Sequence, residues 1–335
     1  MKQLFTGMIG AGIIGGGLLA AAPASADFPT RDLEGVIQWG AGGATDAVAR
    51  ALQPFVEEEL GRRVIMSNRT GGSGAIAVRY VQSQASDGYT LLVGAENPQI
   101  YKVLGIADVD YGDFVPVNIP ARGVVVISAP ADAPWADFDE LLADVQANPG
   151  TVRMGGTGPG GLVHVTEAMI RSVTDFDVIT VPYDGEGPGL TAMLGGAVDF
   201  MPTGLSAAYE LIRAGRARPL AVLNAEAIPQ LPDTAPITDT LPDLAQFLPW
   251  GPFYGFFVNQ GTPDAAVERL QTAFATAVDS EEFTQMMLDR GNVVMNTAGD
   301  EAVEFLERWQ SVTSWLLYDT DAAENSPEDF GIPRP

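Results

Sequence analysis

Short apolar runs alternate with helical patterns along most of this chain, and this alternation restricts the fold more than any other feature. The runs at residues 35–39 and 89–94 predict strands, and the second is continuous, as expected for a strand buried on both faces. Between them, apolar residues recur at helical spacing from Ala47 to Leu60, although Pro54 should kink this helix or split it in two. Strands that alternate with helices predict a mostly parallel α/β sheet, with ligands bound beyond the carboxyl ends of the strands.

The loop after the first run has the sequence Gly-Ala-Gly-Gly-Ala-Thr-Asp, at residues 40–46. Its three glycines let a backbone approach a ligand closely, and the helix that follows presents unpaired N–H groups and a partial positive charge. Such a helix start binds anions, although an ordinary tight turn between a strand and a helix explains the same residues. A second glycine-rich loop at residues 155–161 favours the first interpretation. We therefore expect the two loops to meet around one small anionic solute.

The first 26 residues have the pattern of an export signal. Lys2 is followed by a glycine-broken apolar segment over residues 4–19, and Ala24-Ser25-Ala26 fits a cleavage site. This pattern predicts a periplasmic protein cleaved after Ala26, and a retained membrane anchor is the alternative. The chain contains no cysteine, which excludes a lipid anchor on an N-terminal Cys, a disulfide, a thiolate nucleophile and a Cys-ligated metal.

The mature chain predicted by this cleavage is strongly acidic. The full chain carries a formal net charge of −25 from 43 acidic and 18 basic residues, and cleavage removes one more positive charge with Lys2. Such a surface repels nucleic acid and anionic lipid, so we expect neither as a partner and no membrane insertion of the mature chain. An anionic ligand is still compatible with this charge, because a helix terminus acts over one turn while distant charges are screened.

The mature chain is long enough for about two domains. A strand at residues 123–128 is followed by a proline-flanked break at 130–134, which we interpret as a crossing into a second lobe. A strand at 253–258 follows a proline-rich passage and is interpreted as the return. We therefore predict a discontinuous first lobe of residues 27–128 and 253–335, a second lobe of residues 129–252, and two crossings that act as a hinge.

Several short motifs are similar to those of one known family. They are Gly-Gly-Ala-Thr-Asp at 42–46, Asn-Arg at 68–69, Asp-Gly-Tyr-Thr-Leu-Leu at 87–92, Val-Pro-Tyr at 181–183, Leu-Gly-Gly at 194–196 and Gly-Thr-Pro at 261–263. With these motifs the chain resembles the receptors of tripartite tricarboxylate transporters, also called Bug-type periplasmic receptors, over nearly its whole mature length. The resemblance implies a monomeric two-lobed (venus-flytrap) α/β protein without cofactor or metal, which delivers a small carboxylate to integral membrane transporter subunits.

The resemblance also implies which residues hold the ligand. It places contacts at Gly42, Gly43 and Thr45 in the first lobe and at Thr157, His164, Asp184 and Thr203 in the second. The predicted sheet edge adds Trp39, Ala41 and Asn97 to this set. Asp184 has an alternative as a residue that caps or begins the helix near Pro188, whereas facing the cleft it would favour a ligand with a hydroxyl, an amine or a protonated acid.

The chain departs from the family pattern at several of these positions. Family members usually have proline where this chain has Gln38 and Ala41, and serine where it has Gly156 and Gly161. Trp39 replaces a usual phenylalanine, which predicts a pocket of different shape. The ligand class is therefore easier to transfer from the family than the ligand itself.

Two other functions are compatible with single motifs of the sequence. Residues 156–161 spell a G-x-G-x-x-G dinucleotide motif with Asp177 and Asp184 downstream, but export removes the chain from cytoplasmic NAD. An exported enzyme acting on a small ester or acid needs a nucleophile paired with a base, yet the chain has no G-x-S-x-G motif, and its single histidine, His164, has no evident partner. We therefore predict no catalytic residues. A chemosensory receptor with the same fold remains an alternative.

Overall fold

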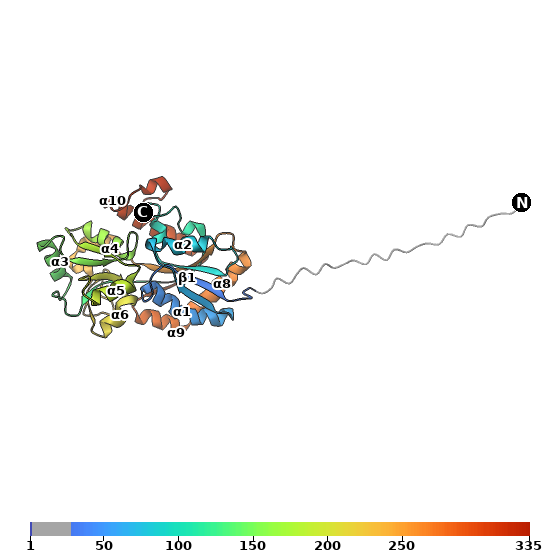
Figure 1. Ribbon diagram of the computed structural model, residues 1–335, viewed down its shortest axis with the longest axis horizontal. Helices are drawn as coiled ribbons and strands as arrows, with labels where there is room; N and C mark the ends of the chain where they lie inside the picture. Colours follow the sequence, from blue (N-terminus) through green and yellow to red (C-terminus); the bar gives the residue numbers. More distant parts are fainter. Residues whose placement is uncertain (2–27) are drawn as a thin grey trace.

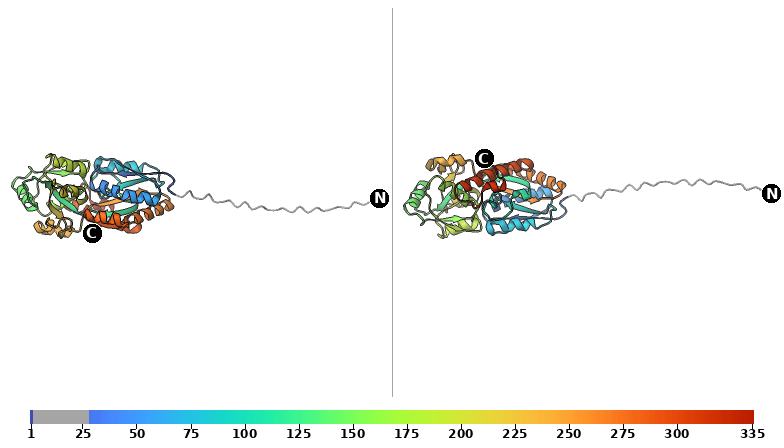
Figure 2. Two further views of the ribbon diagram at one scale, coloured as in Figure 1. Left: turned by 90° about the horizontal axis from the view of Figure 1, so that it is seen from below. Right: turned by 90° about the horizontal axis from the view of Figure 1, so that it is seen from above.

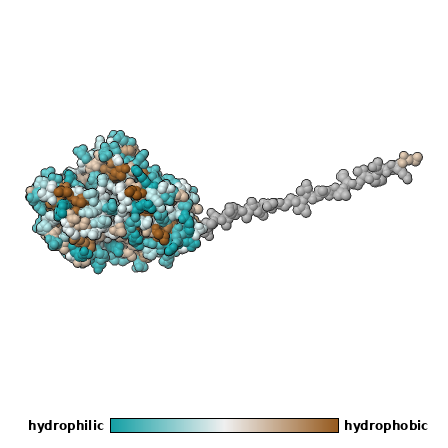
Figure 3. Space-filling view, viewed as in Figure 1, coloured by the Kyte–Doolittle hydropathy of each residue, from teal (hydrophilic) through white to brown (hydrophobic). Residues whose placement is uncertain are grey.

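The chain forms two lobes, each with strands in its centre and helices around them (Figure 1). The computed structural model describes Met1 and residues 28–335, so the predicted export signal and its cleavage site lie outside the described residues. None of the helices in residues 28–335 is long and apolar enough to cross a membrane. The face in Figure 3 is mostly hydrophilic, with small separate apolar patches.

The larger lobe is built on a six-stranded sheet in the order β11-β4-β10-β3-β1-β2. Its strands are β1 (Leu33–Ile37), β2 (Val64–Asn68), β3 (Thr90–Gly94), β4 (Phe114–Arg122), β10 (Phe253–Asn259) and β11 (Val293–Thr297). β1 runs parallel to β2 and β3, whereas β10 is antiparallel to β3 and β4, and β11 is antiparallel to β4. The sheet is therefore mixed rather than mostly parallel, because β10 and β11 join it late in the chain and in the opposite direction.

Helices cover both faces of this sheet. They are α1 (Ala44–Leu60), α2 (Ala75–Gln82), α8 (Asp264–Val278), α9 (Glu281–Asp289) and α10 (Gly299–Asp319), with the short 3₁₀ turns η1 (Gly72–Gly74), η2 (Asn97–Ile100), η3 (Tyr111–Asp113) and η5 (Pro327–Phe330). In Figure 1, α2 lies above the sheet and α1 and α9 lie below it. Side chains of β1 alternate between these layers, since Val36 packs in the core with α2 while Leu33 and Ile37 pack in the core with α1.

Helix α1 continues through Pro54, so the expected split is wrong. Pro54 is exposed, while Leu52 and Val56 beside it are buried in the core and hold both halves of the helix against the sheet. The helix ends, as predicted, at Gly61, which has a left-handed φ of 64°.

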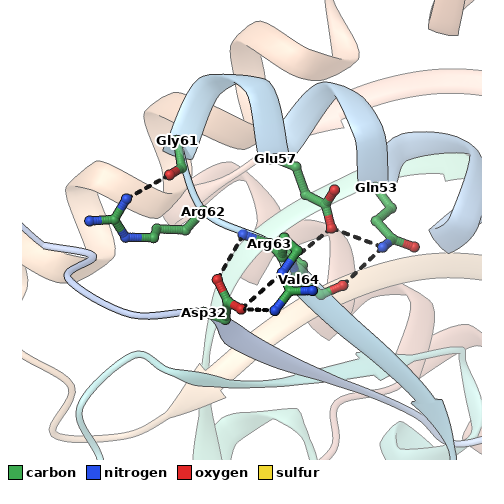
Figure 4. A network of polar contacts seen from close by, with 7 residues as sticks. All are labelled: Asp32, Gln53, Glu57, Gly61, Arg62, Arg63 and Val64. Carbon is green, nitrogen blue, oxygen red and sulfur yellow. Dashed lines mark hydrogen bonds and ion pairs between the residues drawn. The ribbon is translucent and has the colours of Figure 1, made fainter.

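A network of polar contacts ties the C-terminal end of α1 to the first two strands (Figure 4). The Glu57 carboxylate accepts hydrogen bonds from the Val64 backbone N–H at 2.8 Å and from Gln53 Nε2 at 2.9 Å. Arg63 pairs with Asp32, just before β1, at 2.6 Å. These contacts fix the direction of α1, and the opposite end of this helix reaches the candidate site.

The smaller lobe holds two groups of strands. β5 (Val125–Pro130) lies between β8 (Met201–Gly204) and β9 (Ala217–Leu223), antiparallel to both, and β6 (Arg153–Gly156) pairs in parallel with β7 (Ile179–Pro182). A bridge between Met154 and Phe200 links the two groups. The helices are α3 (Phe138–Ala147), α4 (Leu162–Arg171), α5 (Glu186–Leu194), α6 (Leu205–Arg213) and α7 (Ile237–Thr240), followed by the 3₁₀ turn η4 (Pro242–Phe247).

The first crossing between the lobes lies earlier than expected. β5 was predicted to end the first lobe, but it pairs with β8 and β9, so the chain changes lobe between β4 and β5. The Gly123 N–H in this crossing donates a 2.8 Å hydrogen bond to the Pro252 carbonyl of the return crossing. A Cβ on Gly251 would overlap with the Gly123 carbonyl oxygen, so the two crossings lie directly against each other.

Helix α10 spans the junction beside these crossings. It contacts β4 of the larger lobe and α4 of the smaller one, and Figure 2 shows it lying across both lobes. The Trp309 indole N–H donates to the Gly251 carbonyl at 3.3 Å, and the Trp250 indole N–H donates to Thr313 at 3.2 Å. The C-terminal helix therefore supports the return crossing.

Candidate functional site

The glycine loop after β1 meets the turn before α5, and this meeting forms the seam between the lobes. The Gly40 N–H donates a 2.8 Å hydrogen bond to the Asp184 carbonyl. A Cβ on Gly185 would lie 2.8 Å from Gly40 N, and a Cβ on Gly187 would overlap with the Ala41 carbonyl oxygen. The glycines let two backbones from different lobes touch, so the lobes are closed in this structure.

A small enclosed cavity lies behind this seam. It is lined by Trp39, Gly43, Ala44, Thr45, Ala95 and Glu96 of the larger lobe, by Thr157, Leu162 and Glu186 of the smaller lobe, and by Pro252 and Tyr254 at the return crossing. The first residues of α1 and α4, Ala44 and Leu162, are both in this set. The space holds about one or two water molecules, so a larger solute can enter only when the lobes separate.

The Glu186 carboxylate joins the two lobes inside this cavity. Its Oε2 accepts a 2.8 Å hydrogen bond from the Ala44 N–H at the start of α1, and its Oε1 accepts a 2.6 Å hydrogen bond from the Gly204 N–H. The start of α1, which we expected to hold the carboxylate of a solute, is therefore bonded to a carboxylate of the other lobe. Burial raises the pKa of Glu186, while the two N–H donors lower it.

Glu96, just after β3, places a second carboxyl group in the cavity. It is 2% exposed, and its Oε2 has no hydrogen-bond partner among the described residues. The pKa of Glu96 is raised to about 8, mainly by burial and to a smaller extent by the nearby Glu186, while hydrogen bonds from the backbone N–H groups of Glu96 and Leu162 oppose the rise. Glu96 is therefore mostly protonated in the closed protein at neutral pH.

Two hydroxyl groups complete the polar lining. Tyr254 Oη and Thr157 Oγ1 are buried and have no hydrogen-bond partner within residues 28–335. Trp39 and Tyr254 add aromatic faces, and the lining residues include no Lys, Arg or His. Buried polar atoms are normally hydrogen-bonded, so these groups are available to a small polar solute.

Four of the ten predicted contact residues line the cavity: Trp39, Gly43, Thr45 and Thr157. Ala41 and Gly42 are exposed and line a wider groove on the surface, and Asp184 is exposed and meets Gly40 through its backbone. Thr203 is fully buried on β8 beside Gly204, outside the cavity lining.

The other two predicted residues have contacts of their own. Asn97 is fully buried and hydrogen-bonds with Gln38, the Ser73 carbonyl and Tyr101. His164 accepts a 3.1 Å hydrogen bond from the Gly160 N–H through Nδ1, and burial lowers its pKa. The loop at 155–161, which we expected to face the loop at 40–46 directly, contributes Thr157 to the cavity, while residues 184–187 form the seam.

Glu96, Glu186 and Tyr254 were missing from the predicted set. A usable signal existed for Glu96, because an acidic residue directly after a buried strand stands at the ligand-binding edge of the sheet. Glu186 gave no such signal, since an acid in the first turn of a helix is common for local reasons. Its partner N–H groups belong to residues far away in the sequence.

Comparison with known proteins identifies the family. Residues 48–312 match the model of the tripartite tricarboxylate transporter family receptor. The chain belongs to this family. Receptors of this family are periplasmic solute-binding proteins, and the match confirms the resemblance found in the sequence motifs.

Individual relatives agree with this assignment. A UPF0065 protein from the tcbD-tcbE intergenic region of Pseudomonas sp. (strain P51) is 30% identical over 294 residues, which covers 85% of this chain and 86% of the relative. Two solved structures are also similar. An R. palustris protein with adipate is 26% identical, with a TM-score of 0.82 over 89% of this chain and 99% of that one. MatC from Rhodopseudomonas palustris with bound malate is 25% identical, with a TM-score of 0.78 over 85% and 100%. These likenesses confirm the two-lobed α/β fold.

Proposed function

We propose that this tripartite tricarboxylate receptor captures a small carboxylate between its lobes and delivers it to integral membrane subunits of a transporter. The observation that carries the proposal is the small cavity at the junction of the lobes, with the first residues of α1 and α4 in its lining. Helix N-termini favour anions. The malate and adipate found with the two similar proteins support a carboxylate of four to six carbons.

Capture requires the lobes to open and close. The closed cavity has room for about one or two water molecules, so the solute enters an open form. Ala44 and Glu186 belong to different lobes, and opening breaks the hydrogen bond between them. The N–H of Ala44 then becomes available to the carboxylate of the solute. Closure around the solute at the two crossings gives the membrane subunits a shape to recognise.

Cleavage of the export signal and a monomeric mature protein belong to this function. Export removes the first 26 residues, and the mature chain acts as a monomer without catalysing a reaction. Intact-mass measurement of the protein isolated from the periplasm should give a chain that begins at Asp27. A full-length chain in the membrane fraction would contradict this maturation.

Calorimetric titration with malate and adipate tests the binding, with glucose as the uncharged control. At least one acid should bind and should lower the radius of gyration measured by small-angle scattering, because the lobes close on it. Cells that lack this chain should also lose uptake of that acid. Binding of glucose alone, or uptake that persists without the chain, would refute the proposed function.

A further inference from the structure

We propose that the cleft selects carboxylates that also carry a protonated amine, so that its solute is an amino acid rather than a plain dicarboxylate. The inference rests on the proposed function and narrows it. It comes from one juxtaposition: Glu96 of the larger lobe and Glu186 of the smaller lobe meet in the same enclosed cavity.

The charge of the cavity favours a cationic group. Glu96 is buried and Glu186 is half-buried, both line the same cavity, and no Lys, Arg or His is among the lining residues. Glu186 satisfies its oxygens with the N–H groups of Ala44 and Gly204, whereas Oε2 of Glu96 has no partner. An ammonium group donates a hydrogen bond to Oε2 and compensates the negative charge that Glu96 gains when it releases its proton.

Groups other than the two acids point to a ligand at the same place. Tyr254 Oη and Thr157 Oγ1 line the cavity, are each more than nine-tenths buried, and have no partner among the described residues. The Trp39 and Tyr254 rings also border the space, and aromatic faces attract an ammonium group. Carboxyl groups, hydroxyl groups and aromatic side chains thus line one cavity.

A plain dicarboxylate fits this lining poorly. One of its carboxylates can take the start of α1 when Glu186 moves away, but its remaining atoms then lie beside Glu96 and Glu186. A second carboxylate can be accommodated there only while Glu96 keeps its proton, because like charges at close range repel in a site with little water. An amino acid offers a carboxylate to the Ala44 N–H and an ammonium group to the two acids, so each end meets a group of opposite sign.

Proton release separates the two kinds of solute. The ionisable groups that interact electrostatically with Glu96 are Glu186, Tyr101, Tyr111 and Tyr254, and none of them is positively charged. Since burial raises the pKa of Glu96 to about 8, roughly nine tenths of the free protein holds this proton at pH 7. An ammonium group beside Glu96 favours the ionised form, so binding should release close to one proton.

Matched pairs of acids test the selectivity. Aspartate carries an ammonium group where malate carries a hydroxyl group. In the same way, 2-aminoadipate carries an ammonium group where adipate carries a hydrogen atom. Calorimetric titration at pH 7 should give an affinity at least about tenfold higher for the amino acid of one pair or both, since a charge-assisted hydrogen bond contributes at least that factor. Titrations in two buffers of different ionisation enthalpy count the protons released.

The variant Glu96→Gln keeps the shape of the side chain and removes its charge. It should lose the preference for the amino acid and the proton release, while its affinity for the plain acid stays equal or rises. Glu58→Gln, on the exposed face of α1, is the matched control and should behave as the wild type. If Glu96→Gln does not fold, the proton count on the wild-type protein decides, and no release on amino-acid binding refutes the inference.

The outcomes separate this inference from the proposed function. If malate and adipate each bind as tightly as their amino counterparts, the inference fails and the carboxylate receptor stands. If neither plain nor amino acids bind, both fail. A folded Glu96→Gln that keeps the full preference also overturns the inference, because it removes the charge on which the selection rests.

Discussion

Replacing Glu96 with Gln should stabilise the protein at alkaline pH. Burial raises the pKa of Glu96 to about 8 from an ordinary value of 4.5, so the folded protein holds a proton that the unfolded chain releases between these values. Stability is therefore unaffected below about pH 4.5, falls as pH rises towards 8, and levels off above it. The difference between a pKa of about 8 and one of 4.5 corresponds to a loss of about 5 kcal/mol in the free energy of unfolding at alkaline pH. This figure is an upper value, because opening of the lobes lets water reach the ionised Glu96.

Urea unfolding followed by circular dichroism from pH 5 to pH 9 measures this difference. The free energy of unfolding of Glu96→Gln minus that of the wild type should grow by up to about 1.4 kcal/mol per pH unit within this window and reach a plateau above pH 8. Asp184→Asn removes one exposed acid and is the control for net charge. A constant difference across the pH range would refute the assignment of a protonated, buried Glu96.

Two further substitutions test the closed seam and the lining. Gly187→Ala should keep the lobes open in small-angle scattering even with saturating ligand, because its Cβ would overlap with the Ala41 carbonyl oxygen, whereas Gly195→Ala, whose Cβ makes ordinary contacts, should close normally. Normal closure of Gly187→Ala would contradict the seam. Tyr254→Phe should change the free energy of unfolding by less than about 1 kcal/mol, since its hydroxyl has no partner, yet should weaken solute binding measured by calorimetry. Unchanged affinity would show that the hydroxyl does not face the solute.

The local pattern of the sequence predicts most elements, while the pairing of strands lies beyond it. The apolar runs locate β1, β3 and β10 to within a few residues. β4 is missed because Pro116 and Pro120 interrupt it, and proline argues against a strand with neighbours on both sides. The sheet tolerates them beside irregular registers with β10 and β11. The lobe to which β5 belongs and the mixed directions of the strands depend on pairing with strands that are far away in the chain.

The glycine-rich loop in the sequence predicts the position of the candidate site. The sequence analysis does not predict the two acidic residues that line it. The loop after β1 does lead into a helix that begins at the cavity. Within this loop, Gly42 has a left-handed φ of 80°, while Gly43 has an ordinary φ of −79°. A Cβ on Gly43 would make ordinary contacts at 3.4 Å or more, so this glycine is not required by strain. Glu186 could not be predicted to reach Ala44, because only closure of the lobes brings them together.

Because Glu186 already accepts a hydrogen bond from the Ala44 N–H, a solute that binds there must displace the Glu186 carboxylate. A solute carboxylate that takes the start of α1 must replace the Glu186 carboxylate there, so the measured affinity is reduced by the strength of the hydrogen bond between Ala44 and Glu186. Charge-assisted hydrogen bonds contribute about 1.5–3 kcal/mol, which predicts that Glu186→Ala tightens the binding of malate by roughly ten- to a hundredfold.

Calorimetric titration of Glu186→Ala beside Glu58→Ala measures this gain, and the exposed Glu58 controls for the change in net charge. Weaker malate binding in a folded Glu186→Ala would mean that Glu186 holds the solute instead of competing with it. If Glu186 does compete, its loss also leaves the N–H of Ala44 without its partner in the unliganded closed form. The same substitution should therefore shift the free protein towards the open form, with a larger radius of gyration in small-angle scattering.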